Sequence, residues 1–173
     1  MKKLLLVITL LCLVLSCLAG CGKENVGGTT ADINIIEPTE APVASYTGYG
    51  IKLSLPDNFQ DATENTYYSE EFTFLYSDGY VEIFGFKVAR GDTADLVAYA
   101  QSEAAEYGTT ASQKDAFWTI SYLDNTMQDT QSCVSVFYDD GESYWTVTAR
   151  CREDVYADNE SAMWTYITSA TFE

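Results

Sequence analysis

Several segments of this chain carry large apolar side chains at both even and odd positions, and this pattern constrains the fold most. Residues 80–89 and 117–123 show it most clearly. Successive residues of a β-strand point to opposite faces, so such strands have two apolar faces. A sheet with one face in water shows a cleaner alternation. Both faces must therefore be covered, which predicts an α+β sandwich with helices or long loops on the sheet.

Turn and stop signals divide this region into elements. Pro56 ends a first strand, and Ser77-Asp78-Gly79 is a hairpin turn. Asp92 begins a helix as its N-cap, with Asp95 three residues later, and Gly108 stops that helix. The pattern predicts an antiparallel-rich sheet of about five to six strands and two helices in one domain. The expected strands are 51–55, 72–76, 80–89, 117–123, 132–138 and 143–151, with a short strand or cap at 171–172, and the expected helices are 93–107 and 161–169.

The composition of the chain changes at Tyr46. Its aromatic residues, 13 Tyr, 8 Phe and 3 Trp, all lie between Tyr46 and Phe172. This composition and length predict one globular domain at 46–173. Residues 21–45 contain glycine, proline and polar residues without a single aromatic, which is typical of a flexible tether.

The first residues have the features of an export signal. Lys2 and Lys3 precede an apolar stretch at 4–18, which is shorter than the roughly 20 residues that span a bilayer as a helix. Leu18-Ala19-Gly20-Cys21 follows and resembles the lipobox of bacterial lipoproteins. That resemblance implies a signal peptide at 1–20 and a lipid on Cys21. Cys17 is one alternative, but bulky Leu15 fits the cleavage site less well. A plain signal peptide or an uncleaved anchor is the other alternative.

The order of the elements also resembles a known family. A strand that ends in Leu-Pro at 49–56, a helix at 93–107, strands at 117–151 and a tail at 161–172 are similar to the PsbP/DcrB-like α/β/α sandwich. The resemblance covers most of 46–173 and implies a small extracytoplasmic accessory domain without known catalysis. It carries no functional residues to this sequence.

The charge balance excludes one class of partner. The chain has 26 acidic and 9 basic residues, and removal of Lys2 and Lys3 with the signal would change the formal charge from −17 to −19. Nucleic-acid binding needs basic surface, so we expect none. Histidine is absent, which removes the commonest general base and zinc ligand. No motif for a cofactor is present, and none is expected.

Two cysteines belong to the predicted domain. A two-residue turn at Asp140–Gly141 pairs Cys133 with Thr148, so Cys133 and Cys151 point to opposite faces of the hairpin. A disulfide cannot cross a sheet, because its Cβ atoms lie within about 4.5 Å. A β-bulge would change the parity and allow the bond. A disulfide and two buried free thiols both remain open.

Acidic loops are candidates for calcium because that ion takes six to eight oxygen ligands. Asp57 lies near Asp61, 139–142 carries three acids, and 153–160 carries four acids and an asparagine. The last segment lacks the central glycine and closing glutamate of an EF-hand loop. Turn and helix-cap roles are the favoured explanation of these acids, and we expect no metal site. A pair of carboxylates for glycoside hydrolysis is the remaining enzymatic alternative.

Aromatic side chains are candidates for a ligand pocket. The same residue types form the core of a small sheet, and that interpretation is favoured for each of them. The candidates are Tyr67, Tyr68, Tyr76, Tyr80, Trp118, Trp145 and Trp164.

These observations predict a location and a broad role. The protein is expected on the outer face of a membrane, held by lipid on Cys21, and the Thr/Glu/Pro-containing tether suits a Gram-positive surface. A non-enzymatic module that binds an envelope protein or a ligand is the leading hypothesis. A structural spacer is the alternative, and a carboxylate-dependent enzyme is the third.

The lipid assignment is tested by one substitution. We expect Cys21→Ser to abolish incorporation of a labelled fatty acid, because the thioether forms on that sulfur alone. Immunoblots should show the unprocessed precursor in place of the processed form. Cys17→Ser is the matched control and should leave labelling intact; persistent labelling of Cys21→Ser would transfer the assignment to Cys17.

Overall fold

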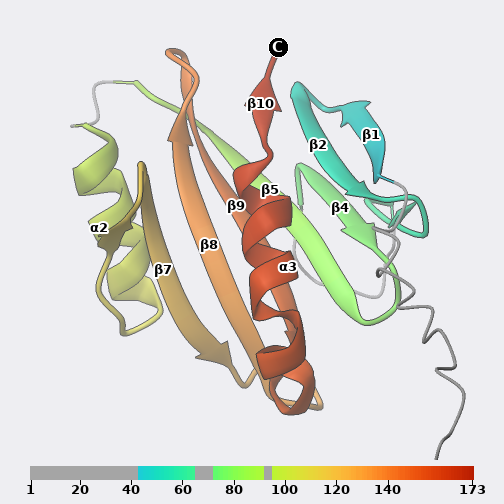
Figure 1. Ribbon diagram of the computed structural model, residues 1–173. Coiled ribbons are helices and arrows are strands. Elements are labelled where there is room, and N and C mark those ends of the chain that lie inside the picture. The colour runs from blue at the N-terminus through green and yellow to red at the C-terminus, as the bar shows by residue number, and fades with distance from the viewer. Residues whose placement is uncertain (1–42, 65–71, 92–94) are drawn as a thin grey trace, which may run out of the picture. The chain divides into compact units, whose positions relative to one another are not determined.

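The computed structural model describes residues 43–64, 72–91 and 95–173. These residues belong to one compact unit, Glu40–Glu173. Its elements form two antiparallel sheets and two α-helices (Figure 1). The predicted α+β class and its two helices are confirmed.

The large sheet has seven strands in the order β3-β4-β5-β9-β8-β7-β6, and every pairing is antiparallel. Its long central strands come from the predicted hairpins. The strands are β3 (Gln60–Asp61), β4 (Phe74–Ser77), β5 (Val81–Ala89), β6 (Ser112–Lys114), β7 (Phe117–Asp124), β8 (Gln131–Asp139) and β9 (Ser143–Arg152).

The small sheet has the order β1-β2-β10 and joins the two ends of the unit. Its strands are β1 (Val43–Gly48), β2 (Ile51–Pro56) and β10 (Thr171–Phe172). In β2, Ile51, Leu53 and Leu55 are buried while Lys52 and Ser54 are exposed. This alternation gives the small sheet one apolar face, and that face packs into the main core.

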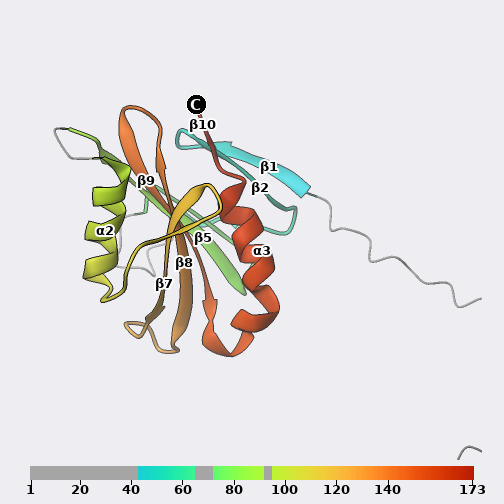
Figure 2. The ribbon, with the colours of Figure 1, turned by 60° about the vertical axis from the view of Figure 1, so that its left-hand side comes forward.

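The helices lie on opposite faces of the large sheet. The helix α2 (Leu96–Glu106) packs on β7 and β8, and α3 (Tyr156–Thr168) packs on β9 and β8 after a short 3₁₀ turn, η1 (Glu153–Val155). Figure 2 shows the sheet between the two helices. Apolar residues fill both interfaces: Ile83 and Val147 lie on the α3 side, and Ile120 lies on the α2 side. The expectation of two covered faces is confirmed.

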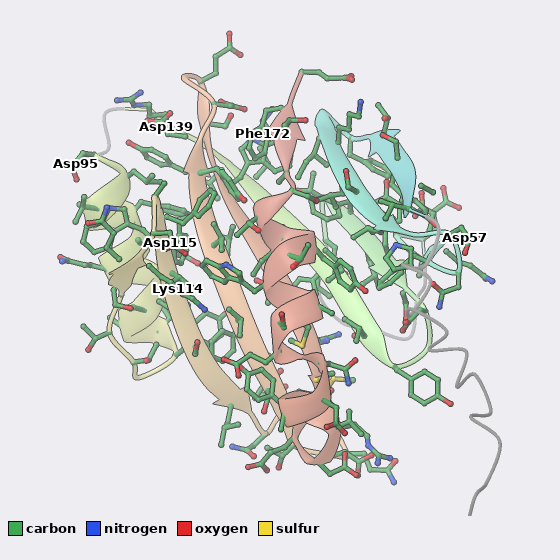
Figure 3. The ribbon with its side chains drawn as sticks, in the orientation of Figure 1. Asp57, Asp95, Lys114, Asp115, Asp139 and Phe172 are labelled. Atoms are coloured by element: carbon green, nitrogen blue, oxygen red, sulfur yellow. The ribbon has the colours of Figure 1, made fainter. Side chains whose placement is uncertain are left out.

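Trp145 is the junction between the two sheets. It is fully buried on β9, and its ring centroid lies 5.1 Å from that of Phe172 on β10. Its indole Nε1 donates to Asp140 Oδ2 at 2.7 Å, and Lys87 Nζ lies 4.8 Å from the ring centroid. Figure 3 shows Phe172 beside the β8–β9 hairpin, with Asp139 near the end of that hairpin. One side chain thus links β9, its own turn and the C-terminal strand.

The strand count exceeds the predicted five to six. The additional strands are β1, β3 and β6, and β1 begins at Val43, within the segment assigned to the tether. Both β3 and β6 are short and fully exposed. They have no apolar residues facing the core, so periodicity could not reveal them.

Both helices begin elsewhere than predicted. The N-cap of α2 is Asp95, whose Oδ1 accepts from Ala98 N at 3.0 Å, and the expected cap at Asp92 lies outside the described residues. The helix α3 begins at Tyr156, five residues before the expected start at Ser161. Its first turn carries no side-chain cap bond, so the usual start signal is missing.

The register of β8 and β9 differs from the prediction by two residues. Cys133 faces Arg150 instead of Thr148, because the turn centres on Gly141–Glu142. Gly141 has a φ of 95°, which suits glycine at the first central position of a hairpin turn. Asp140 accepts from Glu142 N and Ser143 N and fixes this arrangement. The predicted pairing was therefore wrong, but the parity of the faces is unchanged.

Gly85 allows the closest approach between strands β4 and β5. A Cβ at this position would lie 2.3 Å from Phe74 Cε1 and 3.1 Å from the Thr146 carbonyl oxygen. Phe74 is fully buried and cannot move aside. We expect Gly85→Ala to lower the free energy of unfolding by about 1–3 kcal/mol, as overpacking does in other cores. Urea unfolding measures the change.

Gly48→Ala is the matched control for Gly85→Ala. Gly48 also lies in a strand, but its nearest neighbour would be 3.9 Å from the added Cβ. Alanine there should be neutral or stabilise the protein by up to about 1 kcal/mol. Equal unfolding midpoints for the two variants would contradict the close-approach argument.

Asp140 links protein stability to pH. Burial alone would raise its pKa, but hydrogen bonds from Trp145, Glu142 N and Ser143 N, together with the Lys87 charge, lower it. Its folded-state stabilisation is therefore present above the ordinary pKa of 3.8 and is lost as the pH falls through the lowered value. We expect Asp140→Asn to lose about 1–2 kcal/mol at pH 7, with the gap to wild type closing in acid.

Urea unfolding between pH 7 and pH 3 tests this expectation. Asp78→Asn is the control, because Asp78 Oδ1 also accepts two backbone N–H bonds in a hairpin, from Tyr80 and Val81. It should show a smaller loss at pH 7, because within the described part of the chain only backbone N–H groups donate to the Asp78 carboxylate, whereas Asp140 also accepts from an indole. A gap for Asp140→Asn that stays constant with pH would refute the linkage.

Candidate functional site

A groove lies between α3 and the strands β6 and β7. The helix packs over β9 and β8, so one of its sides faces the outer strands of the sheet. A hollow of about 140 Å³ lies there, with Val134 of β8 among its lining residues. Figure 3 shows Lys114 and Asp115 between α2 and α3, on the side of β7. We call this hollow and the adjoining one described below the α3–β7 groove.

The helix side of the groove is formed by Tyr156, Glu160 and Trp164. They are spaced by four residues, which places them in one row along a helix. All three are partly or fully accessible, whereas Met163 and Ile167 of the same helix are buried. The helix therefore uses one stripe for the core and the adjacent stripe for the groove.

The strand side is rich in hydroxyl groups. It carries Ser112 and Lys114 of β6 and Thr119 and Ser121 of β7. Thr119 Oγ1 donates to the carbonyl oxygen of Ser135 at 2.6 Å, which fixes that side chain. These polar residues alternate along β7 with Trp118, Ile120 and Tyr122, which pack towards α2.

A second hollow of about 230 Å³ continues the groove. It shares Ser121 and Tyr156 with the first and adds Leu123, Ser132 and Cys133 to the lining, along with Tyr122. Leu123 is 54% exposed, so the end of the groove carries accessible apolar surface. The two hollows are adjacent, since Ser121 and Tyr156 line both of them.

Opposite charges stand on the two sides of the groove. Lys114 Nζ lies 4.0 Å from the centroid of the Trp164 ring, a cation–π geometry that holds the ammonium group in place. Burial, and then the negative charge of Glu160, raise the pKa of Tyr156 to about 12. Its hydroxyl therefore stays protonated at neutral pH and can donate a hydrogen bond.

Two other hollows lie around Arg152. One is lined by Asp129 and Glu153 among others, and the other by exposed Tyr80 and Val155. Arg152 forms an ion pair with Asp154. The Arg152 guanidinium is therefore already paired with a carboxylate. Neither hollow combines a cation, a carboxylate, hydroxyl groups and a tryptophan as the α3–β7 groove does.

The cysteines have different positions. Cys21 lies outside the described residues. Cys133 and Cys151 are free and buried, and they point to opposite faces because Cys133 pairs with Arg150 and Cys151 with Ser132. Burial raises the pKa of the Cys133 thiol to about 12. Of the two alternatives from the sequence, the structure has the free thiols.

The acidic segments serve local turns. Asp61 accepts from Thr63 N, and Asp139 accepts from Gly141 N. Asp154 pairs with Arg152. Within 43–64, 72–91 and 95–173, no three Asp, Glu, Cys or His side chains converge as a metal site would require.

The aromatic candidates separate into core and surface residues. Tyr76 and Trp145 are buried in the core, and Tyr80 is 79% exposed. Trp118 packs against the α2-side core, while Trp164 alone lines the groove. Tyr67 and Tyr68 lie outside the described residues.

Sequence reasoning missed most of the groove. Trp164 was a candidate, but Lys114, Tyr156 and Glu160 were not recognised as its neighbours. Residues 156, 160 and 164 are four residues apart, which would place them on one side of a helix. The predicted helix began only at Ser161, so this relation was not recognised. Ser112 and Lys114 of β6 carried no such signal, because that strand is too short to show a pattern.

Sequence comparison gives no relatives for this chain. No protein-family model matches it, and no curated protein does. Structure comparison does find similar folds. The solution structure of cyanobacterial PsbP (CyanoP) from Synechocystis sp. PCC 6803 matches with a TM-score of 0.55 at 11% identity, covering 91% of this chain and 99% of that one. The predicted PsbP-like fold is thereby supported.

Two further structures match with lower scores. The Saccharomyces cerevisiae Ran-binding protein Mog1p has a TM-score of 0.49 at 10% identity, covering 76% of this chain and 96% of its own. A crystal structure from Bacteroides thetaiotaomicron VPI-5482 has a TM-score of 0.49 at 9% identity, covering 78% and 49%. At such identities the similarity concerns the fold alone.

Proposed function

We propose that this protein is a lipid-anchored module of the cell envelope that binds another envelope component without catalysing a reaction. The observation that carries the binding role is the α3–β7 groove, where Trp164, Glu160 and Lys114 converge beside a row of hydroxyl groups. Small-ligand sites combine apolar surface with a few convergent polar groups in this way.

The anchor is proposed from the sequence. The segment Leu18-Ala19-Gly20-Cys21 follows a basic start and an apolar stretch, and residues 21–45 supply a tether. Two or more acyl chains on Cys21 would bind a bilayer stably, because each buried methylene contributes about 0.8 kcal/mol. Among the described residues no helix is both long enough and apolar enough to span a membrane.

A non-enzymatic role is supported by the chemistry of the groove. Cys133 lines its second hollow, but a thiol with a pKa of about 12 is a poor nucleophile at neutral pH. The sequence has no histidine to act as a base. Glu160, Lys114 and Tyr156 are suited to orient a ligand through hydrogen bonds.

Retention of envelope material tests the binding role. The mature chain carrying Cys21→Ser is immobilised and incubated with envelope extract. A matched column carries the same chain with Ser121→Trp, which fills the groove from an exposed strand position. We expect at least one protein or glycan component to be retained several-fold more strongly on the first column.

A charge-matched acidic protein is the control for nonspecific attraction to the strongly negative surface. Equal retention on all three columns would overturn the binding role in favour of a spacer. Retention that is unaffected by Ser121→Trp would place the binding surface elsewhere on the domain.

A further inference from the structure

We infer that the α3–β7 groove binds a short, uncharged oligosaccharide; this inference rests on the proposed binding role and names its ligand class. Three properties of the groove point to this class. The groove mixes hydrogen-bond donors and acceptors, and its helix side carries aromatic residues. The edge of β7 beside it is already paired with β6.

The polar groups of the groove match a ligand with many hydroxyls. Glu160 offers acceptors only, Lys114 offers donors only, and Ser112, Thr119 and Ser121 have hydroxyls. A sugar hydroxyl donates and accepts at once, so adjacent hydroxyls can satisfy all these groups. An apolar ligand would instead take water away from the charged groups of Glu160 and Lys114 and offer them no hydrogen bond, which is costly.

The helix side supplies the apolar contact that a sugar ring needs, from Tyr156 and from the part of the Trp164 ring that the Lys114 ammonium does not cover. Tyr156 and Trp164 lie eight residues apart on α3 and line the same side of the groove, with Glu160 between them. One face of a pyranose ring exposes C–H groups that pack on aromatic surface, while its rim carries hydroxyls. The second hollow shares Tyr156 and extends the groove, so a chain of rings fits better than one ring.

An extended peptide fits less well because the edge of β7 is already used. Strand β6 pairs with β7 at Thr119, and Thr109 Oγ1 donates to the carbonyl oxygen of Ser121 at 3.2 Å. Strand addition needs such backbone groups to be available. A polyanion is also disfavoured, since the chain has a formal charge of −17 and Lys114 is the single cation of the groove's lining.

Calorimetric titration with defined trisaccharides tests the inference. The mature chain carrying Cys21→Ser is titrated with cellotriose, xylotriose, N-acetylchitotriose and the anionic trigalacturonate. We expect saturable binding of at least one uncharged trisaccharide and at least tenfold weaker binding of trigalacturonate. Glu160→Gln and Ser121→Trp should each weaken the binding at least tenfold, whereas Tyr80→Ala, at an exposed aromatic in another hollow, should leave it unchanged.

The three tryptophans give a second measurement, by NMR of their indole N–H groups. The Trp164 signal, identified by its loss in Trp164→Phe, should shift on titration, while that of fully buried Trp145 should remain. Circular dichroism verifies that each variant is folded. Binding that shifts no Trp164 signal, or that survives both groove substitutions, would overturn the site.

The outcomes also separate this inference from the proposed function. If no uncharged trisaccharide binds but envelope material is retained through the groove, the ligand class is wrong and the binding role stands. If neither is bound, both fail. Equal affinity for trigalacturonate would overturn the charge argument and with it the uncharged class.

Discussion

The packing of Trp145 is the interaction on which the rest of the structure depends. This fully buried side chain lies on the central strand β9, which precedes α3 in the chain. It contacts Phe172 of β10, the strand that follows α3. Its indole bond to Asp140 also fixes the turn that sets the register of β8 and β9. Core tryptophans of this kind contribute about 3–5 kcal/mol to stability. The position of α3 follows, because the helix is held between β9 and β10 along the chain.

The placement of α3 creates the groove. Met163 and Ile167 bury one stripe of the helix in the core, and the neighbouring stripe then faces β7 across open space. On that side β7 presents Thr119 and Ser121 next to Phe117, whereas Trp118 and Tyr122 turn towards α2. Stability and binding surface thus come from adjacent stripes of the same elements, and Tyr156, Trp164 and Val134 contribute to both.

The sequence predicted the long strands and the existence of both helices, because each has strong periodicity or an adjacent turn signal. It failed where those signals were weak. The short strand β6 has only exposed residues, and α3 begins at Tyr156 without a capping side chain. The turn at Gly141–Glu142 was misplaced by one residue, because Asp140–Gly141 is an equally good local hairpin signal. The choice between them depends on the Asp140–Trp145 bond, which is not a property of the turn sequence alone.

The sequence by itself indicated a two-sided α+β sandwich, since strands with two apolar faces must be covered on both sides, and its hairpin turns favour antiparallel strands. It also supplied the lipobox-like segment at Cys21, since that signal is a contiguous stretch of residues. Only the tertiary structure brought Lys114, Tyr156 and Trp164 together, from a short edge strand and a helix more than 40 residues later in the chain. The reason is physical: a groove is defined by the surfaces that packing leaves open, and these depend on where every other element is placed.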